Sequence, residues 1–171
     1  TRDNDDIIEE VRELRRHGFR FVLLADDNFY PVTLNDLAMA KRRSDPAALR
    51  NLEALRRERF ELMERLAELP DEMVFFTQIT MEAAEDPAYL AAMRRARIRG
   101  ALVGIESVTA EGLKSVFKDF NHAGEALVTR LRAFSEHGVH VLGSFIFGLP
   151  TDKPDTFAAT ASLAQRAGVS F

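Results

Sequence analysis

Short apolar runs alternate with longer amphipathic stretches along most of the 171-residue chain. In four places a stretch ending in basic or polar residues is followed by glycine, then by a run rich in Val, Ile, Leu and Phe. Glycine just beyond a helix adopts the left-handed conformation without steric cost, and Arg or His nearby suits the negative helix end. Each unit therefore predicts a helix, a glycine cap and a buried strand. The glycines are Gly18, Gly100, Gly138 and Gly168, and the runs after them cover residues 19–25, 101–105, 139–147 and 169–171.

A fifth strand is expected over residues 73–79, where Pro70-Asp71-Glu72 takes the place of glycine. Asp-Pro pairs predict two helix starts, because Asp caps a helix and Pro fits its first turn. The expected helices cover residues 5–18, about 33–43, a long stretch from Asp45-Pro46, one from Asp86-Pro87, 110–117, 125–136 and one from Lys153-Pro154.

This alternation predicts an α/β fold in which a parallel sheet is built from repeated βα units with right-handed crossovers. Strands that are apolar throughout fit a sheet covered on both faces or closed into a barrel. The pattern leaves two architectures open, an open doubly wound sheet and an arc of a TIM-type barrel. A full eightfold barrel takes about 250 residues, so this chain would supply only part of one. Either architecture places the binding site at the carboxyl ends of the strands.

The composition fits a soluble globular protein, with 46% hydrophobic residues, 29% charged residues and a net charge of −4. Such a mild acidic balance gives no general attraction for nucleic acid or anionic membranes. No apolar run is long enough to span a bilayer and the first residues are no signal peptide, so we expect a cytoplasmic protein. Three basic clusters are interpreted as solvated helix faces because acids lie near each: Lys41-Arg42-Arg43, Arg56-Arg57 and Arg94-Arg95.

The chain contains no cysteine. This excludes a disulfide scaffold, a thiolate zinc site, a cysteine nucleophile and iron–sulfur ligands within these residues. The four histidines lack metal-ligand spacing and are interpreted as structural or solvated. There is no initiating Met, and the chain stops in an apolar run that has barely begun. We therefore expect a piece of a longer protein.

Polar residues follow four of the expected strands at the edge where a ligand would bind. Asp26-Asp27-Asn28 follows the run 19–25, and Glu106-Ser107 follows 101–105. The Asp-Asp-Asn sequence fits a turn or a helix cap as well as a ligand site, and Ser107 could cap the short helix near Thr109. The remaining strand-end residues are Thr77, Gln78 and Thr80 after one strand, and Gly148 to Asp152 after another.

These motifs, in this order, resemble the core of radical S-adenosylmethionine enzymes, in the branch that carries a cobalamin-binding domain. Residues 102–107, followed by Gly112 and Lys118, are similar to the fourth strand and following loop of that family. Residues 143–152 are similar to its fifth-strand motif and turn. Residues 26–29 and 76–80 are similar to the second-strand and third-strand ends of the cobalamin branch.

The resemblance implies a partial (β/α)6 barrel, in which residues 1–171 hold strands two to five and the start of strand six. It also implies a site for S-adenosylmethionine. The second-strand residues would contact the amino group, the fourth-strand residues the ribose and the fifth-strand residues the adenine. In that order, the residues are Asp26, Asp27 and Asn28, then Glu106 and Ser107, then Ile146 and Gly148, with Gln78 added from the third strand. Lys118 could also face the cofactor, although a solvated lysine is the favoured interpretation.

One feature of the family is missing, because no CxxxCxxC loop holds a 4Fe–4S cluster here. We expect that loop to lie upstream of Thr1, which makes the chain a fragment of an enzyme. That enzyme would cleave S-adenosylmethionine to a 5′-deoxyadenosyl radical or transfer methyl groups with cobalamin. The fragment itself should be inactive, hold no catalytic or metal-binding residue, bind no cofactor and self-associate through exposed barrel edges.

Two alternatives remain. The chain could be a cluster-free binding module or degenerate barrel that recognises a nucleoside-like ligand or a protein partner. An ordinary TIM-barrel hydrolase or aldolase fragment fits the alternation but not the order of the motifs. The substrate is not identified by these residues.

Overall fold

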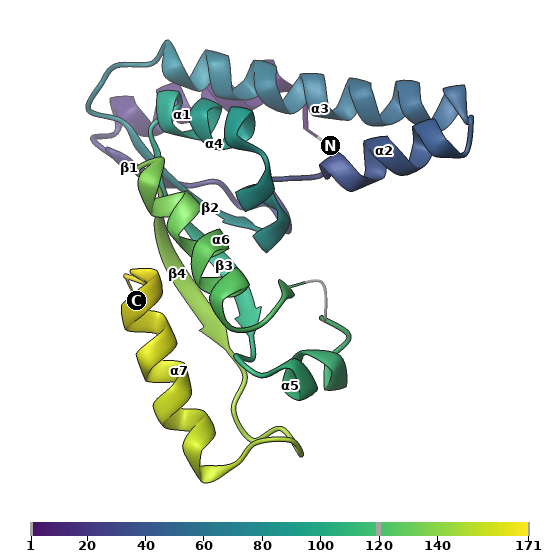
Figure 1. Ribbon diagram of the computed structural model, residues 1–171. Coiled ribbons are helices and arrows are strands. Elements are labelled where there is room, and N and C mark those ends of the chain that lie inside the picture. The colour runs from purple at the N-terminus through teal and green to yellow at the C-terminus, as the bar shows by residue number, and fades with distance from the viewer. Residues whose placement is uncertain (1, 119–120, 171) are drawn as a thin grey trace.

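The computed structural model describes residues 2–118 and 121–170. Four parallel strands form one sheet in the order β1-β2-β3-β4, so each strand pairs with the next one along the chain (Figure 1). A doubly wound sheet reverses its strand order at a switch point, and this sheet does not. The described chain is therefore an arc of the barrel type. Its strands are β1 (Phe21–Leu23), β2 (Val74–Ile79), β3 (Ile98–Glu106) and β4 (His140–Phe145).

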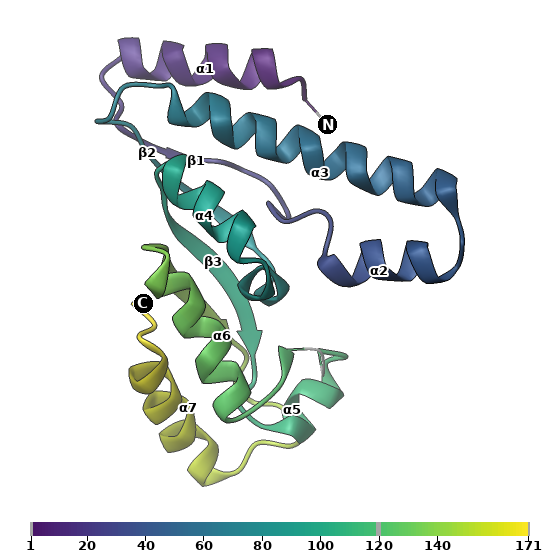
Figure 2. The ribbon, with the colours of Figure 1, turned by 45° about the horizontal axis from the view of Figure 1, so that its top comes forward.

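The main helices follow one another along one side of the curved sheet (Figure 2). Right-handed crossovers between successive neighbouring strands require this arrangement. Shorter helical segments lie in the loops that follow the strands. The main helices are α1 (Asn4–Arg16), α3 (Pro46–Ala67), α4 (Pro87–Arg95), α6 (Glu125–Glu136) and α7 (Pro154–Ala167), and the shorter ones are α2 (Leu34–Arg42), η1 (Met81–Glu85) and α5 (Ala110–Ser115).

The core lies between the helices and the sheet face that they cover. Alternate strand residues such as Phe75, Val103 and Val141 are buried there, together with helix residues such as Leu66 and Phe134. On the other face Phe21 and Leu23 are 61% and 60% exposed. Within the described residues the sheet is covered on one face, which fits the barrel alternative and not a sheet covered on both faces.

Three of the four predicted glycine caps are confirmed, since Gly18, Gly138 and Gly168 have φ values of 94°, 71° and 68°. The Asp-Pro helix starts are confirmed as well. The side chain of Asp45 accepts hydrogen bonds from the first amides of α3, and that of Asp86 accepts one from α4.

The prediction for Gly100 was wrong, because β3 already begins at Ile98 and Gly100 lies inside it. The left-handed residue at this junction is Arg97, with φ 59°. Glycine is required at position 100 by packing instead, since an added Cβ would lie 2.7 Å from the ring of Phe76.

The side chain of Arg97 forms hydrogen bonds that hold this non-glycine residue in the left-handed conformation. Its guanidinium and Nε donate to four backbone carbonyls at the end of α3 and in the turn before β2. The acceptors are the carbonyls of Leu66 (2.9 Å), Ala67 (3.2 Å), Leu69 (2.7 Å) and Met73 (3.1 Å). These bonds satisfy carbonyls that a helix end leaves unpaired.

Several element ends differ from the prediction. Strands β1 and β4 are shorter than residues 19–25 and 139–147, and α5 ends before Phe117, whose φ is 58°. The sixth strand is not formed at residues 169–170, where the amide of Ser170 donates to Val141 (3.0 Å) without a continued ladder. Phe171 lies outside the described residues. Within the described ranges, no helix is both long and apolar enough to cross a membrane.

Candidate functional site

A cavity of about 230 Å³ lies at the carboxyl ends of the strands, and we call it the rim cavity. It brings together three of the predicted site residues, Asp27, Gln78 and Glu106, from the ends of three different strands. Parallel strands end at the same edge of a sheet, so residues distant in sequence meet there. The complete lining is Asp27, Gln78, Ile79, Thr80, Met81, Leu102, Gly104, Glu106, Lys118, Asn121 and Ser144.

Asn28 holds the loop after β1 against the end of β2. Its Nδ2 donates to the carbonyl of Tyr30 (2.9 Å), and its Oδ1 accepts from the amides of Tyr30 (3.1 Å) and Thr80 (3.2 Å). Gln78 Nε2 donates to the carbonyl of Asp27 (3.2 Å) and closes the same junction. The Asn28 side chain therefore stabilises a turn, which is one of the two roles expected for this motif. Both its oxygen and its nitrogen are hydrogen-bonded to backbone groups.

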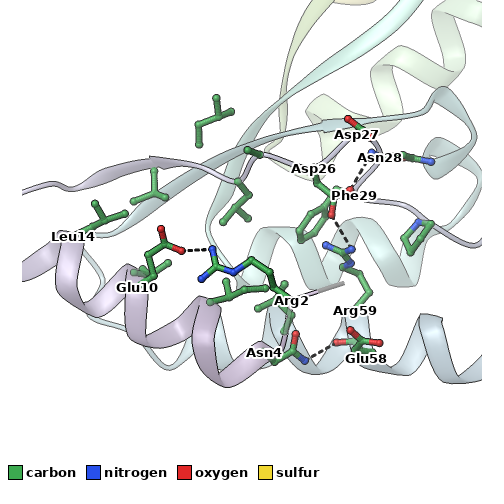
Figure 3. A pocket seen from close by; sticks show the side chains of 18 residues that line it. Arg2, Asn4, Glu10, Leu14, Asp26, Asp27, Asn28, Phe29, Glu58 and Arg59 are labelled. Atoms are coloured by element: carbon green, nitrogen blue, oxygen red, sulfur yellow. Dashed lines mark hydrogen bonds and ion pairs between the residues drawn. The ribbon is translucent and has the colours of Figure 1, made fainter.

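Asp26 points to a second, larger cavity of about 600 Å³ between α1, α3 and β1 (Figure 3). Its Oδ2 lies 2.9 Å from Nη2 of Arg59, and its Oδ1 accepts from the amide of Asn28 (3.1 Å). Arg59 could not be singled out from the sequence, because it lies on α3 among residues of both charges. Asp27, in contrast, is exposed and borders both cavities.

The interpretation of the Arg56-Arg57 cluster as a solvated face was wrong for Arg56. Its side chain is 18% exposed and its Nη1 lies 2.6 Å from Oδ2 of Asp86, which is 3% exposed. The hydroxyl of Tyr30 donates to the same carboxylate oxygen (3.0 Å). Burial, together with the charge of Asp86, raises the pKa of Tyr30 above its ordinary value. A buried carboxylate needs such partners because desolvation disfavours the ion.

Glu106 adopts a left-handed conformation with φ 68°, at a register shift between Gly104 and the end of β3. Its carbonyl accepts from the amide of Ile146 (2.8 Å). Buried Asn121 fixes the strand from the other side, because its Nδ2 donates to the carbonyl of Gly104 (2.9 Å). Non-glycine residues with a left-handed backbone conformation are strained, and such strain is concentrated at functional sites.

Ser107 is buried and belongs to the turn before α5. Its Oγ accepts from the amide of Thr109 (3.3 Å), while Thr109 itself caps α5 by accepting from Gly112 (3.0 Å). Ser107 does not line the rim cavity. Lys118 does line it and is half-buried.

Ile146 and Gly148 lie just beyond β4 and outside the rim cavity. Ile146 is 41% exposed, and its amide continues the pairing with β3 through Glu106. Gly148 has φ 87°, and its amide donates to Oδ2 of Asp152 (2.8 Å), so the turn requires glycine here. Nothing lies within 4 Å of a Cβ added at Gly148, which leaves open space beside it.

The chain is similar to a curated protein and to a solved structure, and no protein-family model matches it. The hopanoid C-2 methylase of Rhodopseudomonas palustris (strain TIE-1) is 32% identical over 105 residues, covering 59% of this chain and 20% of the methylase. The structure of TsrM from Kitasatospora setae, a radical S-adenosylmethionine methyltransferase with cobalamin and a [4Fe-4S] cluster bound, matches with a TM-score of 0.67 at 18% identity.

The fold is shared with a radical S-adenosylmethionine methyltransferase. The match to TsrM covers 99% of this chain and 30% of TsrM, so the chain spans only a minor part of either relative. The predicted α/β class and its partial-barrel form are confirmed.

The donor set of the rim cavity suits an organic ligand better than a metal. Within residues 2–118 and 121–170, no group of three or more His, Cys, Asp or Glu could hold a metal ion. The cavity offers two carboxylates, two amides, a lysine and hydroxyls, and the buried Oγ1 of Thr80 lacks a hydrogen-bond partner among the described residues. Carboxylates bind ammonium groups and hydroxyls through charge-assisted hydrogen bonds.

Proposed function

We propose that this chain supplies the strand-end surface that binds S-adenosylmethionine in a radical enzyme that transfers methyl groups with cobalamin. The observation that carries the proposal is the convergence of Asp27, Gln78 and Glu106 on the rim cavity. The similarity to hopanoid C-2 methylase and to TsrM, both methylating enzymes by name, supports the same reaction class.

Each polar group at the rim has a role that its chemistry supports. The carboxylate of Asp27 would accept hydrogen bonds from the methionyl ammonium, and that of Glu106 from the ribose hydroxyls. Gln78 would hold the Asp27 backbone in place through their hydrogen bond. Lys118 would attract the methionyl carboxylate, while the open space beside Gly148 would admit the adenine.

The size of the rim cavity constrains the binding mode. Its volume of about 230 Å³ is below the range of roughly 300–1,000 Å³ that is common for ligand pockets. The ligand would therefore extend from the cavity along the uncovered face of the sheet, past Leu102 and Ser144.

The residues of this chain do not fit a 4Fe–4S cluster, because the sequence has no cysteine to supply thiolates. In the resembled family, a bound cluster supplies the electron that cleaves the sulfonium. The cluster and cobalamin would be held by residues outside these 171 positions, and the chain's own contribution is to bind and orient S-adenosylmethionine.

Equilibrium binding of S-adenosylmethionine to the intact protein tests the proposal. Glu106→Ala should weaken binding about tenfold or more, since a hydrogen bond to a charged group contributes roughly 1.5–3 kcal/mol. Iron content should stay unchanged. Glu53→Ala on the exposed side of α3 is the matched control and should bind as the wild type does. Unchanged affinity in Glu106→Ala would remove Glu106 from the site.

A further inference from the structure

The loop after β1 carries two adjacent carboxylates whose surroundings differ sharply. The Asp26 carboxylate is paired with Arg59 at 2.9 Å, and the side chains of the two residues are 31% and 13% exposed. Figure 3 shows the pair reaching across from the loop to α3. Asp27 is exposed, and its carboxylate makes no ion pair with a described residue.

Arg59 holds the far side of the same loop through a ring contact. Its guanidinium carbon lies 4.5 Å from the centroid of the Phe29 ring, which is buried. Phe29 is fixed in turn, because its amide donates to the carbonyl of Gln78 (2.8 Å) and its carbonyl accepts from the hydroxyl of Tyr89. One arginine therefore fixes residues at both ends of the segment 26–29.

Arg56 extends this arrangement by one turn of α3. Its ion pair with Asp86 links α3 to the N-terminus of α4, and Tyr30, next to the loop, donates to the same carboxylate. The loop is thus attached to two helices through buried charges. A loop held this firmly presents its one remaining carboxylate, Asp27, in a defined place.

We propose that Arg59 is a positioning residue: it neutralises Asp26 and fixes the loop, so that Asp27 alone takes the cationic amino group of the ligand. This inference rests on the proposed function. The family resemblance implies that Asp26, Asp27 and Asn28 all contact the amino group, whereas this inference gives that contact to Asp27 and pairs Asp26 with Arg59. One free carboxylate beside one ammonium balances the charge, whereas a second free carboxylate would leave an excess negative charge when the ligand is bound.

The first test needs no ligand. Asp26→Asn, Arg59→Met and the double variant form a cycle in which the midpoint of thermal unfolding is measured. We expect the double variant to lose less than the sum of the two single losses, because each single variant leaves a partner unpaired. Additive losses would overturn the role of Arg59, whatever the ligand proves to be.

The second test measures binding of S-adenosylmethionine and of 5′-methylthioadenosine, which has the same nucleoside but no amino acid group. Asp27→Asn should weaken S-adenosylmethionine binding at least tenfold and 5′-methylthioadenosine binding less than twofold. The Asp26→Asn/Arg59→Met variant keeps Asp27 but loosens its loop, so it should weaken S-adenosylmethionine binding about threefold to fivefold, less than Asp27→Asn does. Unchanged binding in this variant would show that Arg59 does not position Asp27.

Equal losses for both ligands in Asp27→Asn would show a merely structural effect and overturn the inference. Equal losses of S-adenosylmethionine binding in Asp27→Asn and in the double variant would overturn it too. If the wild-type protein binds neither nucleoside, the proposed function fails and the ligand role of Asp27 fails with it. The unfolding cycle would still decide whether Arg59 holds Asp26.

Discussion

The carboxylate of Glu106 lies over Gly104, so that a Cβ added at Gly104 would be 2.6 Å from Oε1 of Glu106. The missing side chain at position 104 is what gives the carboxylate its place in the rim cavity. The left-handed backbone of Glu106 and the hydrogen bond from Asn121 fix the strand end that carries both residues.

Gly104→Ala should therefore displace the Glu106 carboxylate and weaken S-adenosylmethionine binding by about threefold or more. Stability should change little, because the displaced atom is the end of a flexible side chain. Gly100→Ala is the control: its Cβ would meet the ring of Phe76 at 2.7 Å, which should cost about 1–3 kcal/mol of stability and leave affinity unchanged. Wild-type affinity in Gly104→Ala would contradict this prediction.

Removing the Asp86 carboxylate should strongly destabilise the chain. Asp86→Ala leaves the half-buried guanidinium of Arg56 unpaired and also removes the cap of α4, so we expect a loss of about 3–5 kcal/mol in urea unfolding. Asp45→Ala removes an exposed cap from α3 and should cost only about 1 kcal/mol. Similar losses in the two variants would show that the ion pair with Arg56 contributes nothing.

Alkaline pH should destabilise the fold through two buried tyrosines. Burial raises the pKa of Tyr30 and of Tyr89, with the charge of Asp86 adding to the effect at Tyr30. Above pH about 10 the unfolded chain loses these phenolic protons while the folded chain keeps them, so the free energy of unfolding falls as pH rises.

The slope reaches about 1.4 kcal/mol per pH unit for each tyrosine. Unfolding measured between about pH 9 and 11.5 should show a shallower fall in Tyr30→Phe than in the wild type. Identical slopes would mean that Tyr30 ionises equally easily in both states.

The 171-residue chain should bind no stoichiometric iron–sulfur cluster after anaerobic reconstitution, because it has no cysteine. Iron and sulfide analysis after desalting provides the measurement. About four irons per chain would contradict the prediction and require non-thiolate ligands throughout.

The helix starts and the strand-end site could be predicted because their signals are local. Asp-Pro pairs mark the starts of α3 and α4, and the sequence-based rule for parallel strands places Asp27, Gln78 and Glu106 at one edge. The same rule could not tell which strand-end residues face a ligand. Asn28 and Ser107 form hydrogen bonds with backbone in their own loops, as their residue types equally allow.

The two arginines of α3 could not be predicted, since their partners are distant in sequence. Arg59 pairs with a residue on the loop after β1, and Arg56 with one at the start of α4. Nearby acids made Arg56 look solvated, and no sequence pattern singled out Arg59. Arg97 was missed for a related reason: glycine is the usual left-handed residue, and only its bonds to the turn after α3 allow an arginine there.

The unbroken strand order has a consequence for how the chain folds. Each βα unit packs mainly on the units before and after it, as in solenoid proteins, so each strand pairing closes a single crossover connection. Assembly can then spread from any one strand pair to its neighbours, and each added unit is stabilised by the surface it covers. Such nearest-neighbour cooperativity lets an arc of four strands hold its shape without the ring being closed.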